Sequence, residues 1–356
     1  MKVSEICKYA PKSNIKARDA CDGGKYVFFT SSADESKRYN AYQHEGEGII
    51  MGTGGNATLH YYDGKYAVST DCIVLLPNEQ IRCKYLYYFF LGNMRVLERG
   101  FKGAGLKHTN KGYIGDIDIG DIPSFERQEK IIGIFDTLQS IIDLRKSEIE
   151  RLDNLIKARF VEMFGDPVSN SRGLPEATLP ELGEFGRGVS KHRPRNDPKL
   201  LGGKYPLIQT GDVASADLYI TSYTGTYSDL GLAQSKMWDE GTLCITIAAN
   251  IAKTAILGFD ACFPDSVVGF RANEKTNNIY IHYWFSFFQR ILEAQAPESA
   301  QKNINLKSLS ELRVIYPTKE EQDAFAAFVA EVDKSKLMFQ KLHQKLNILQ
   351  QKAGDI

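Results

Sequence analysis

The sequence lacks the features of a membrane protein or a secreted protein. Its 356 residues contain no apolar run long enough to cross a bilayer, and no basic segment followed by an apolar one opens the chain. Six cysteines are present, but none forms a Cys-x-x-Cys pair or lies at ligand spacing from a histidine, so no zinc site is predicted. A cytoplasmic protein with buried free thiols is expected.

An excess of charge and a recognisable catalytic motif are also missing. The 44 basic and 44 acidic residues give a net charge of zero, which argues against a protein that coats nucleic acid through charge alone. No adenine-methylating Asn/Asp-Pro-Pro-Tyr motif, Phe-x-Gly-x-Gly cofactor turn or Ser/His/Asp signature occurs. The glycine-rich segment 52–56 lacks the Gly-Lys-Ser/Thr that would follow in a phosphate loop, so it predicts a turn between strands. We therefore expect no catalytic residues, no metal and no cofactor in this chain.

What the sequence does contain is a long internal repeat. Pro123 with Gln128 and Pro317 with Gln322 stand at the same spacing, about 194 residues apart, and each pair precedes a long helical pattern. A repeat of this length is a duplicated domain with its helix rather than a solenoid unit. Further matches keep the same order: 85–90 with 280–285, Asn78 with Asn273, Asn110 with Asn305, and, more loosely, 3–6 with 179–182.

Each copy predicts a β-rich domain followed by a long helix. Short apolar runs bounded by Gly, Asp and Asn predict strands, and an aromatic helix closes each domain, at 84–98 and at 279–293. The expected fold class is α+β, with two pseudo-symmetric β-rich domains separated by two long antiparallel coiled-coil helices. The expected strands cover residues 26–29, 49–51, 66–68, 73–76, 207–208, 242–247, 254–257 and 267–268.

Both long helices carry apolar residues in alternating steps of three and four, which is typical of a coiled-coil seam. We expect the two helices to pair with each other; the alternative is that each helix packs only on its own domain. Arg145, Arg159 and Ser335 interrupt the seam. The residues expected to pack there or to bind a partner are Phe135, Leu138, Ile142, Ile149, Leu152, Ile156, Phe328, Val332, Phe339, Leu342 and Leu346.

Three stretches, at 8–18, 99–111 and 187–195, are basic and free of acidic residues. Lysine suits contact with phosphate and arginine suits bidentate contact with guanine, so these stretches are candidates for DNA binding. The alternative is that each is an ordinary solvated surface. The candidate residues are Lys12, Lys16, Arg18, Lys102, Lys107, Lys111, Arg187, Lys191, Arg193, Arg195 and Lys302.

Taken together, the repeat, the two Pro-x-x-x-x-Gln junctions and the paired seams resemble the specificity subunit of type I restriction–modification systems. The resemblance extends over essentially the full length, although residues 25–30 are only a weak version of the segment at 204–213. The residues that carry it lie at 123–131, 158–167, 204–213, 303–309 and 317–322.

The resemblance implies two target-recognition domains, residues 1–125 and 165–316, each of which reads one half of a bipartite double-stranded DNA site. Residues 126–164 and 317–356 would be spacer helices on which two methyltransferase subunits dock, and a restriction (translocase) subunit would join that complex. S-adenosylmethionine and ATP would then belong to the partners, and this chain would be a non-catalytic subunit.

Other interpretations stay open. The chain could be the recognition module of another DNA-modification or defence system built on the same repeat. It could also be a coiled-coil scaffold whose two domains bind protein, which its zero net charge allows. A stand-alone nuclease or methyltransferase would require activity from the purified chain alone.

Overall fold

The computed structural model describes residues 1–249, 251–295 and 304–353, with the side chains of 290–295 and 339–353 excepted. The chain divides into two compact units, which we call the first unit (residues 1–148 with 338–356) and the second unit (residues 149–337). Each unit has its own apolar core, and the predicted α+β fold class is confirmed. In the described part of the chain, no helix is long and apolar enough to cross a membrane.

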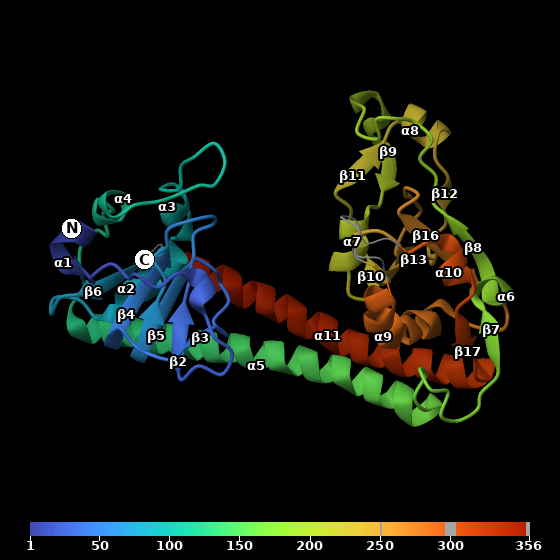
Figure 1. The fold of residues 1–356 in the computed structure, drawn as a ribbon, viewed down its shortest axis with the longest axis horizontal. Helices are drawn as coiled ribbons and strands as arrows, with labels where there is room; N and C mark the ends of the chain where they lie inside the picture. The colour runs from blue at the N-terminus through green and yellow to red at the C-terminus, as the bar shows by residue number, and fades with distance from the viewer. Residues whose placement is uncertain (250, 296–303, 354–356) are drawn as a thin grey trace. The chain divides into compact units, whose positions relative to one another are not determined.

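The first unit is built on one six-stranded sheet with the order β1-β6-β4-β5-β2-β3 (Figure 1). Ile49 pairs with Leu75 on one face of the sheet and Ile50 pairs with Val74 on the other, and all four side chains are buried. Burial on both faces explains why these strands are continuous apolar runs rather than alternating ones. The strands are β1 (Cys7–Tyr9), β2 (Tyr26–Phe29), β3 (Arg38–Tyr39), β4 (His44–Gly52), β5 (Leu59–Val68) and β6 (Cys72–Pro77).

The helices of the first unit correct one prediction. The single helix expected over 84–98 is two helices, because the chain leaves the helical conformation at Asn93 (φ −115°, ψ 35°). The Asn93 side chain donates a hydrogen bond to the carbonyl of Phe89 at 2.9 Å, and such bonds compete with helix continuation. The elements are α1 (Val3–Ile6), the 3-10 helix η1 (Ala17–Asp19), α2 (Cys83–Gly92), α3 (Met94–Glu98) and α4 (Lys111–Gly115).

The second unit contains three sheets, with the strand orders β10-β14-β13-β16-β8, β11-β9-β15-β12 and β17-β7 (Figure 1). The strands are β7 (Glu176–Thr178), β8 (Gly183–Arg187), β9 (Leu201–Leu207), β10 (Tyr219–Ile220), β11 (Gly225–Tyr227), β12 (Met237–Trp238), β13 (Leu243–Thr246), β14 (Thr254–Leu257), β15 (Ala261–Cys262), β16 (Val267–Ala272) and β17 (Arg313–Ile315). The helices are α6 (Leu179–Leu182), the 3-10 helix η2 (Pro198–Leu200), α7 (Thr210–Ser215), α8 (Asp229–Ala233), α9 (Asn278–Gln295) and α10 (Leu306–Ser310).

Hydrogen bonds reproduce the repeat predicted from the sequence. The backbone N–H of Asn78 donates to the carbonyl of Ile6 at 2.7 Å, and that of Asn273 donates to Leu182 at 2.9 Å. Asn110 and Asn305 likewise begin α4 and α10 with side-chain caps. The repeat does not extend to every strand, because the four-stranded sheet around β9 is separate from the five-stranded one, whereas the first unit has a single larger sheet.

Two long helices, α5 (Phe125–Phe164) and α11 (Lys319–Ala353), each contribute to both units. At 1.5 Å per residue, the 40 residues of α5 form a helix about 60 Å long. Within the second unit, Phe160 of α5 lies 5.4 Å from Phe325 near the start of α11, measured between ring centroids. Asp153, earlier in α5, contacts Lys336, later in α11, so the helices run antiparallel there as expected.

Burial follows the predicted positions in α5 and departs from them in α11. Phe135, Ile142 and Ile156 are buried, and Leu138, Ile149 and Leu152 are half-buried. In α11 the buried positions are Phe325, Val329, Val332 and Lys336, whereas the expected Phe328 is half-buried and Ser335 is exposed. The side chains of Phe339, Leu342 and Leu346 lie outside the described residues.

Residues of α5, among them the predicted seam residue Phe135, also pack on their own domains, so the two interpretations of the seam are not exclusive. Phe135 stacks on Tyr88 of α2 at 4.8 Å, and Phe160 stacks on Tyr280 of α9 at 5.3 Å. The two arginines that interrupt the seam turn to neighbouring acids: Arg145 bonds to Glu148 and Arg159 to Glu162.

Candidate nucleic-acid interface

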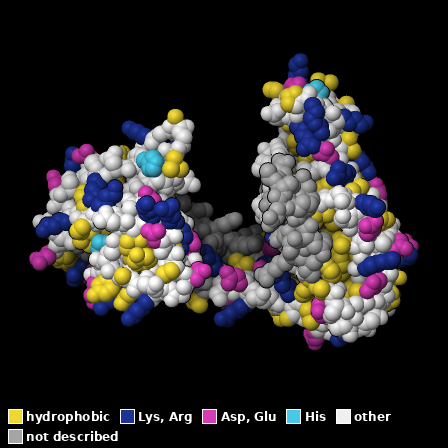
Figure 2. All heavy atoms as spheres, viewed as in Figure 1, with side chains coloured by type: hydrophobic (Ala, Val, Ile, Leu, Met, Phe, Trp, Pro, Cys, Tyr) yellow, Lys and Arg dark blue, Asp and Glu magenta, His cyan; other side chains and the backbone are white. Residues whose placement is uncertain are grey.

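Lys and Arg side chains gather at the end of the second unit that carries β9 and α8 (Figure 2). The predicted stretch 187–195 runs from Arg187, the last residue of β8, toward η2, and its four candidate residues are exposed. Its backbone is fixed to the residue that follows α8: the N–H of Lys191 donates to the Gln234 carbonyl at 3.3 Å, and that of His192 to the Gln234 side chain at 3.0 Å. The stretch is therefore a supported surface loop rather than a free one.

The four candidate residues of this stretch are not equivalent. Arg193 Nη2 lies 3.5 Å from one carboxylate oxygen of Asp265, and Arg195 pairs with the other. Neither Arg187 nor Lys191 has an ion-pair partner in the part of the chain that the structure describes. Arg187 and Lys191 are thus free to meet an anion, while the charge of Arg193 and Arg195 is partly neutralised. Asp265 could not be predicted in this role, because 70 residues separate it from Arg195 in the sequence.

The basic residues of the first unit fall into three places. Lys102 and Lys107 belong to the long loop between α3 and α4, which projects from the unit (Figure 1). Two hydrogen bonds between Lys102 and His108 close this loop, at 2.9 and 3.0 Å, and its tip carries Leu106, which is 70 % exposed. Lys12 and Lys111 line one cavity. Lys16 precedes η1, and Arg18 is part of it. The remaining candidate of the whole set, Lys302, is not in the first unit and lies outside the described residues.

A buried glutamine joins each long helix to its domain. We call the contacts around Gln128 the first joint and those around Gln322 the second joint. Gln128 donates to the carbonyl of Pro123 at 2.9 Å, and its side-chain oxygen accepts from the N–H of Arg82 at 2.7 Å. Because Arg82 immediately precedes α2, the first joint ties the start of α5 to the aromatic helix of the domain.

The second joint repeats this arrangement with more bonds. Gln322 is fully buried and donates to the carbonyls of Pro317 at 2.9 Å and Lys275 at 3.0 Å. Its side-chain oxygen accepts from the hydroxyl of Thr276 at 2.7 Å. The sequence marked both glutamines as repeated positions, but it did not show which backbone groups they satisfy.

A buried lysine lies where α5 and α11 meet the β-rich part of the second unit. Lys336 is 2 % exposed, and its Nζ lies 2.6 Å from Asp153 of α5 and 2.5 Å from Asp217, which precedes β10. Desolvation acts to lower the pKa of Lys336, but its hydrogen bonds to Asp153 and Asp217 outweigh that effect and raise it. Lys336 was not predicted as a buried residue, because a lysine is expected to be exposed unless it is paired. Its partners Asp153 and Asp217 are distant in the sequence, so the pairing could not be foreseen.

Asp333, one turn before Lys336, belongs to the same cluster. Its carboxylate lies 4.0 Å from the Lys336 amino group. Desolvation raises the pKa of Asp333 to about 6, with Asp217 and Asp153 adding to the rise and Lys336 opposing it. Three carboxylates therefore share one buried ammonium group.

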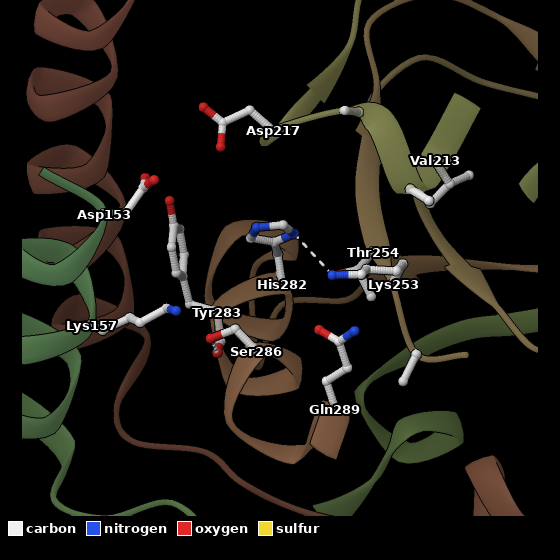
Figure 3. A pocket seen from close by; sticks show the side chains of 13 residues that line it. Asp153, Lys157, Val213, Asp217, Lys253, Thr254, His282, Tyr283, Ser286 and Gln289 are labelled. Carbon is white, nitrogen blue, oxygen red and sulfur yellow. Dashed lines mark hydrogen bonds between the residues drawn. The ribbon is translucent and has the colours of Figure 1, made fainter. Parts of the chain in front are cut away.

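Beside this cluster is a cavity of about 260 Å³ (Figure 3). Its lining comes from α5, from α7 and the segment after it, from β14 and from α9. His282 Nδ1 lies 3.0 Å from the Thr254 hydroxyl, and in Figure 3 the Tyr283 hydroxyl points toward the side on which Asp153 and Asp217 lie. Desolvation lowers the pKa of His282 to about 4, so the ring is neutral at neutral pH.

Metal binding finds no support in the part of the chain that the structure describes, since no group of three His, Cys, Asp or Glu side chains is placed to hold an ion. The six cysteines are free, and five are buried as expected, but Cys21 is partly exposed. Gly52 ends β4, and residues 53–56 lie in the connection between β4 and β5, as predicted.

Comparison with known proteins decides the family. A family model described as the type I restriction modification DNA specificity domain matches residues 1–154 and 176–349. The chain belongs to this family. Both joints of this specificity subunit lie within the matched residues.

Individual proteins agree with the family match. The EcoDI specificity subunit of a type I restriction enzyme from Escherichia coli is 24 % identical over 358 residues, which cover 90 % of this chain and 78 % of that protein. The S subunit of a type I restriction-modification system from M. genitalium is similar in structure, with a TM-score of 0.59, 14 % identity, and coverage of 99 % of this chain and 94 % of that chain. A chain from a structure of a type I R-M system, solved to explain complex assembly and conformational transition, has a TM-score of 0.55 at 15 % identity and covers 100 % of this chain and 96 % of that one. At these identities the two structures show a shared fold.

Proposed function

We propose that this specificity subunit recognises a bipartite site in double-stranded DNA, with one β-rich domain for each half-site, and directs methyltransferase and restriction subunits to it. The observation that carries the proposal is the pair of joints. In each joint a buried glutamine donates a hydrogen bond to the carbonyl of the proline five residues before it. This bond attaches one β-rich domain to one long helix. A repeated frame with two unlike surfaces suits a protein that reads two different half-sites.

The basic surfaces differ between the two units in the way this proposal requires. The first unit offers lysines on and beside the loop between α3 and α4, whereas the second offers arginines gathered around Asp265 with Lys191 nearby. Phosphate contacts place a protein on the duplex, and base contacts specify the sequence. Different side chains on a common frame would therefore give different half-sites.

Partner binding is assigned to the long helices. Ile134, Leu144 and Leu155 of α5 are 59, 65 and 48 % exposed, and they fall on one side of the helix at about 100° per residue, whereas the less exposed Phe125 and Val161, at 44 and 41 %, fall on the other side. Leu337 and Met338 of α11 are also exposed, at 54 and 62 %. Exposed apolar side chains that recur on one face indicate an interaction surface. We infer that two methyltransferase subunits dock on these helices and that the restriction subunit joins the resulting complex.

The chemistry is assigned to the partners. The sequence holds none of the methylation or cofactor motifs searched for above, which supports a non-catalytic role for this chain. S-adenosylmethionine would then be bound by the methyltransferase subunits, and ATP by the restriction subunit.

The proposal is tested by selecting duplexes from a random pool with the complex of this chain and its cognate methyltransferase. We expect enrichment of one sequence with two defined segments and an undefined spacer, retained in the presence of excess competitor DNA. Retention of protein partners without any enriched duplex would instead favour the scaffold interpretation.

A further inference from the structure

The first unit contains a cavity of about 240 Å³ near the loop between α3 and α4. Apolar side chains of β5 and β6 line part of it, among them Val68 and Val74. The polar part of the lining consists of Lys12, Lys111, Asn110 and the hydroxyl-bearing residues Thr53, Thr70 and Thr109.

The charge of this lining has one sign. It includes two lysines and no carboxylate. Within the described part of the chain neither lysine has an ion-pair partner, and Lys111 Nζ lies 5.0 Å from the ring centroid of Tyr9. The acid beside the lining is Asp71, which accepts a long hydrogen bond of 3.5 Å from the hydroxyl of Thr70. The cavity therefore favours an anion.

Thr109 provides a second, independent indication. It is 8 % exposed, and its buried hydroxyl has no hydrogen-bond partner among the described residues. A buried hydroxyl without a partner is unfavourable, so its retention points to an acceptor that the folded chain does not supply. A phosphate oxygen beside two lysines would be such an acceptor.

We propose that this cavity binds a backbone phosphate of duplex DNA. Lys12 and Lys111 would supply the positive charge, and the Thr109 hydroxyl would donate a hydrogen bond to a phosphate oxygen. This inference rests on the proposed DNA-binding function and adds a contact that is independent of base sequence.

The position of Thr109 gives this phosphate contact a further role. The N–H of Thr109 donates to the carbonyl of Thr53 at 3.0 Å, directly after the pair of hydrogen bonds between Lys102 and His108 that closes the projecting loop. A phosphate held at Thr109 would therefore fix the base of this loop on the DNA backbone. The exposed Lys107 and Leu106 would then be placed to meet a groove.

The test uses the complete chain in complex with its cognate methyltransferase. Binding of a duplex with the selected site and of one without it is measured across roughly 50 to 200 mM salt. We expect the double variant Lys12→Ala/Lys111→Ala to bind both duplexes about tenfold more weakly. The slope of log K against log salt should fall by about 0.9, the value for one lost phosphate.

Thr109→Val separates the hydroxyl from the charge. The substitution keeps the shape of the side chain and removes a buried hydroxyl that has no partner among the described residues. Affinity for both duplexes should therefore fall, while the salt slope is retained and the thermal midpoint of unfolding is unchanged or higher. Lys25→Ala is the matched control, because Lys25 is an exposed lysine of the same unit that does not line the cavity. We expect it to leave affinity and slope unchanged.

The outcomes distinguish this inference from the function on which it rests. If the wild-type complex binds its site but the double variant and Thr109→Val bind as well as wild type, the cavity does not hold a phosphate and the proposed function stands. Loss of affinity for the selected site alone would show base reading and overturn the phosphate assignment. If the wild-type complex binds duplexes without any sequence preference, the proposed function is wrong and the variants still decide the phosphate contact; if it binds no duplex, both proposals are wrong.

Discussion

Gln128 and Gln322 donate the same hydrogen bond in two places: each side chain binds the carbonyl of the proline five residues earlier, at 2.9 Å. Both glutamines are buried, at 1 % and 0 % exposure. Each bond fixes the first turn of a long helix to the loop that leads into it. The two joints are therefore equivalent, although the β-sheets of the two units differ.

Replacing Gln322 by Ala should destabilise the second unit more than any exposed substitution on the same helix. The change leaves the carbonyls of Pro317 and Lys275 and the hydroxyl of Thr276 without their buried partner. We expect the free energy of unfolding to fall by about 2–4 kcal/mol in urea denaturation. Glu331→Ala, at an exposed position of the same helix, is the control and should change it by less than about 0.5 kcal/mol. Equal effects of the two substitutions would show that the joint is not a stabilising contact.

The Lys336 cluster should respond unequally to the loss of its two sides. In Lys336→Met, the carboxylates of Asp153 and Asp217 can regain water, because they are 44 and 54 % exposed. In Asp153→Asn/Asp217→Asn, the ammonium group stays buried with Asp333 as its remaining acid. We expect the double variant to lose about 3 kcal/mol of unfolding free energy and Lys336→Met to lose less. The opposite order would mean that the carboxylates, not the lysine, carry the desolvation cost.

Two groups near the cavity of the second unit should make stability depend on pH in opposite directions. The pKa of Asp333 is raised from 3.8 to about 6, so its contribution is present at low pH and is lost as pH rises through about 6. The pKa of His282 is lowered from 6.5 to about 4, so stability falls as pH falls from 6.5 toward 4. In the wild type these effects oppose each other.

Removing either group should expose the other. Asp333→Asn should make stability rise more steeply between pH 4.5 and 6.5 than in the wild type, and His282→Gln should make it rise less. The measurement is the urea unfolding free energy at these two pH values, with Glu331→Gln as a control for the loss of one exposed acid on the same helix. Identical pH dependence in all four proteins would contradict the assignment.

The basic stretch of the second unit should divide into strong and weak contributors to DNA binding. Arg187 and Lys191 are exposed without an ion-pair partner in the described residues, whereas Asp265 pairs with Arg195. Arg187→Ala and Lys191→Ala should each reduce the salt slope by about 0.9 if each contacts one phosphate, and Arg195→Ala should reduce it less. Asp265→Asn should raise affinity for duplexes without the site. Lys236→Ala, which removes a lysine paired with Glu184, is the control for the loss of one positive charge. Equal salt slopes for all variants would show that the stretch is an ordinary solvated surface.

Helix length should set the spacing between the half-sites. Four residues inserted after Arg151 in α5, matched by four after Met338 in α11, add about 6 Å of helix. We expect the preferred spacer to lengthen by about two base pairs while both half-sites stay the same. The same four residues inserted in the connection at 169–172, outside the helices, should leave the spacer unchanged. An unchanged spacer in the helical variant would show that the helices do not measure it.

Local pattern was sufficient for much of the fold. The strands at 26–29 and 254–257 and the limits of α5 follow from apolar runs, turn residues and a heptad pattern, all of which are local signals. The break at Asn93 was missed because the apolar pattern continues past it, although Gly92 and Asn93 are both weak helix formers and the Asn93 side chain caps the end of α2. The seam of α11 was misplaced because Lys336 is buried by two acids that are distant in the sequence.

The candidate site was predicted only in part for the same reason. Basic stretches can be seen in a sequence, but their neutralising partners cannot, and Asp265 lies 70 residues from Arg195. The cavity around Thr109 brings together residues from positions 10 to 111, and its unpartnered hydroxyl can be recognised only after folding.

The central claim is that one chain reads two half-sites on a repeated frame. The most direct measurement is methylome sequencing of cells that express this chain with its cognate methyltransferase. The account predicts methylation at a single bipartite sequence, two defined segments separated by a spacer of fixed length. Methylation at one continuous sequence, or no sequence-dependent methylation, would contradict it.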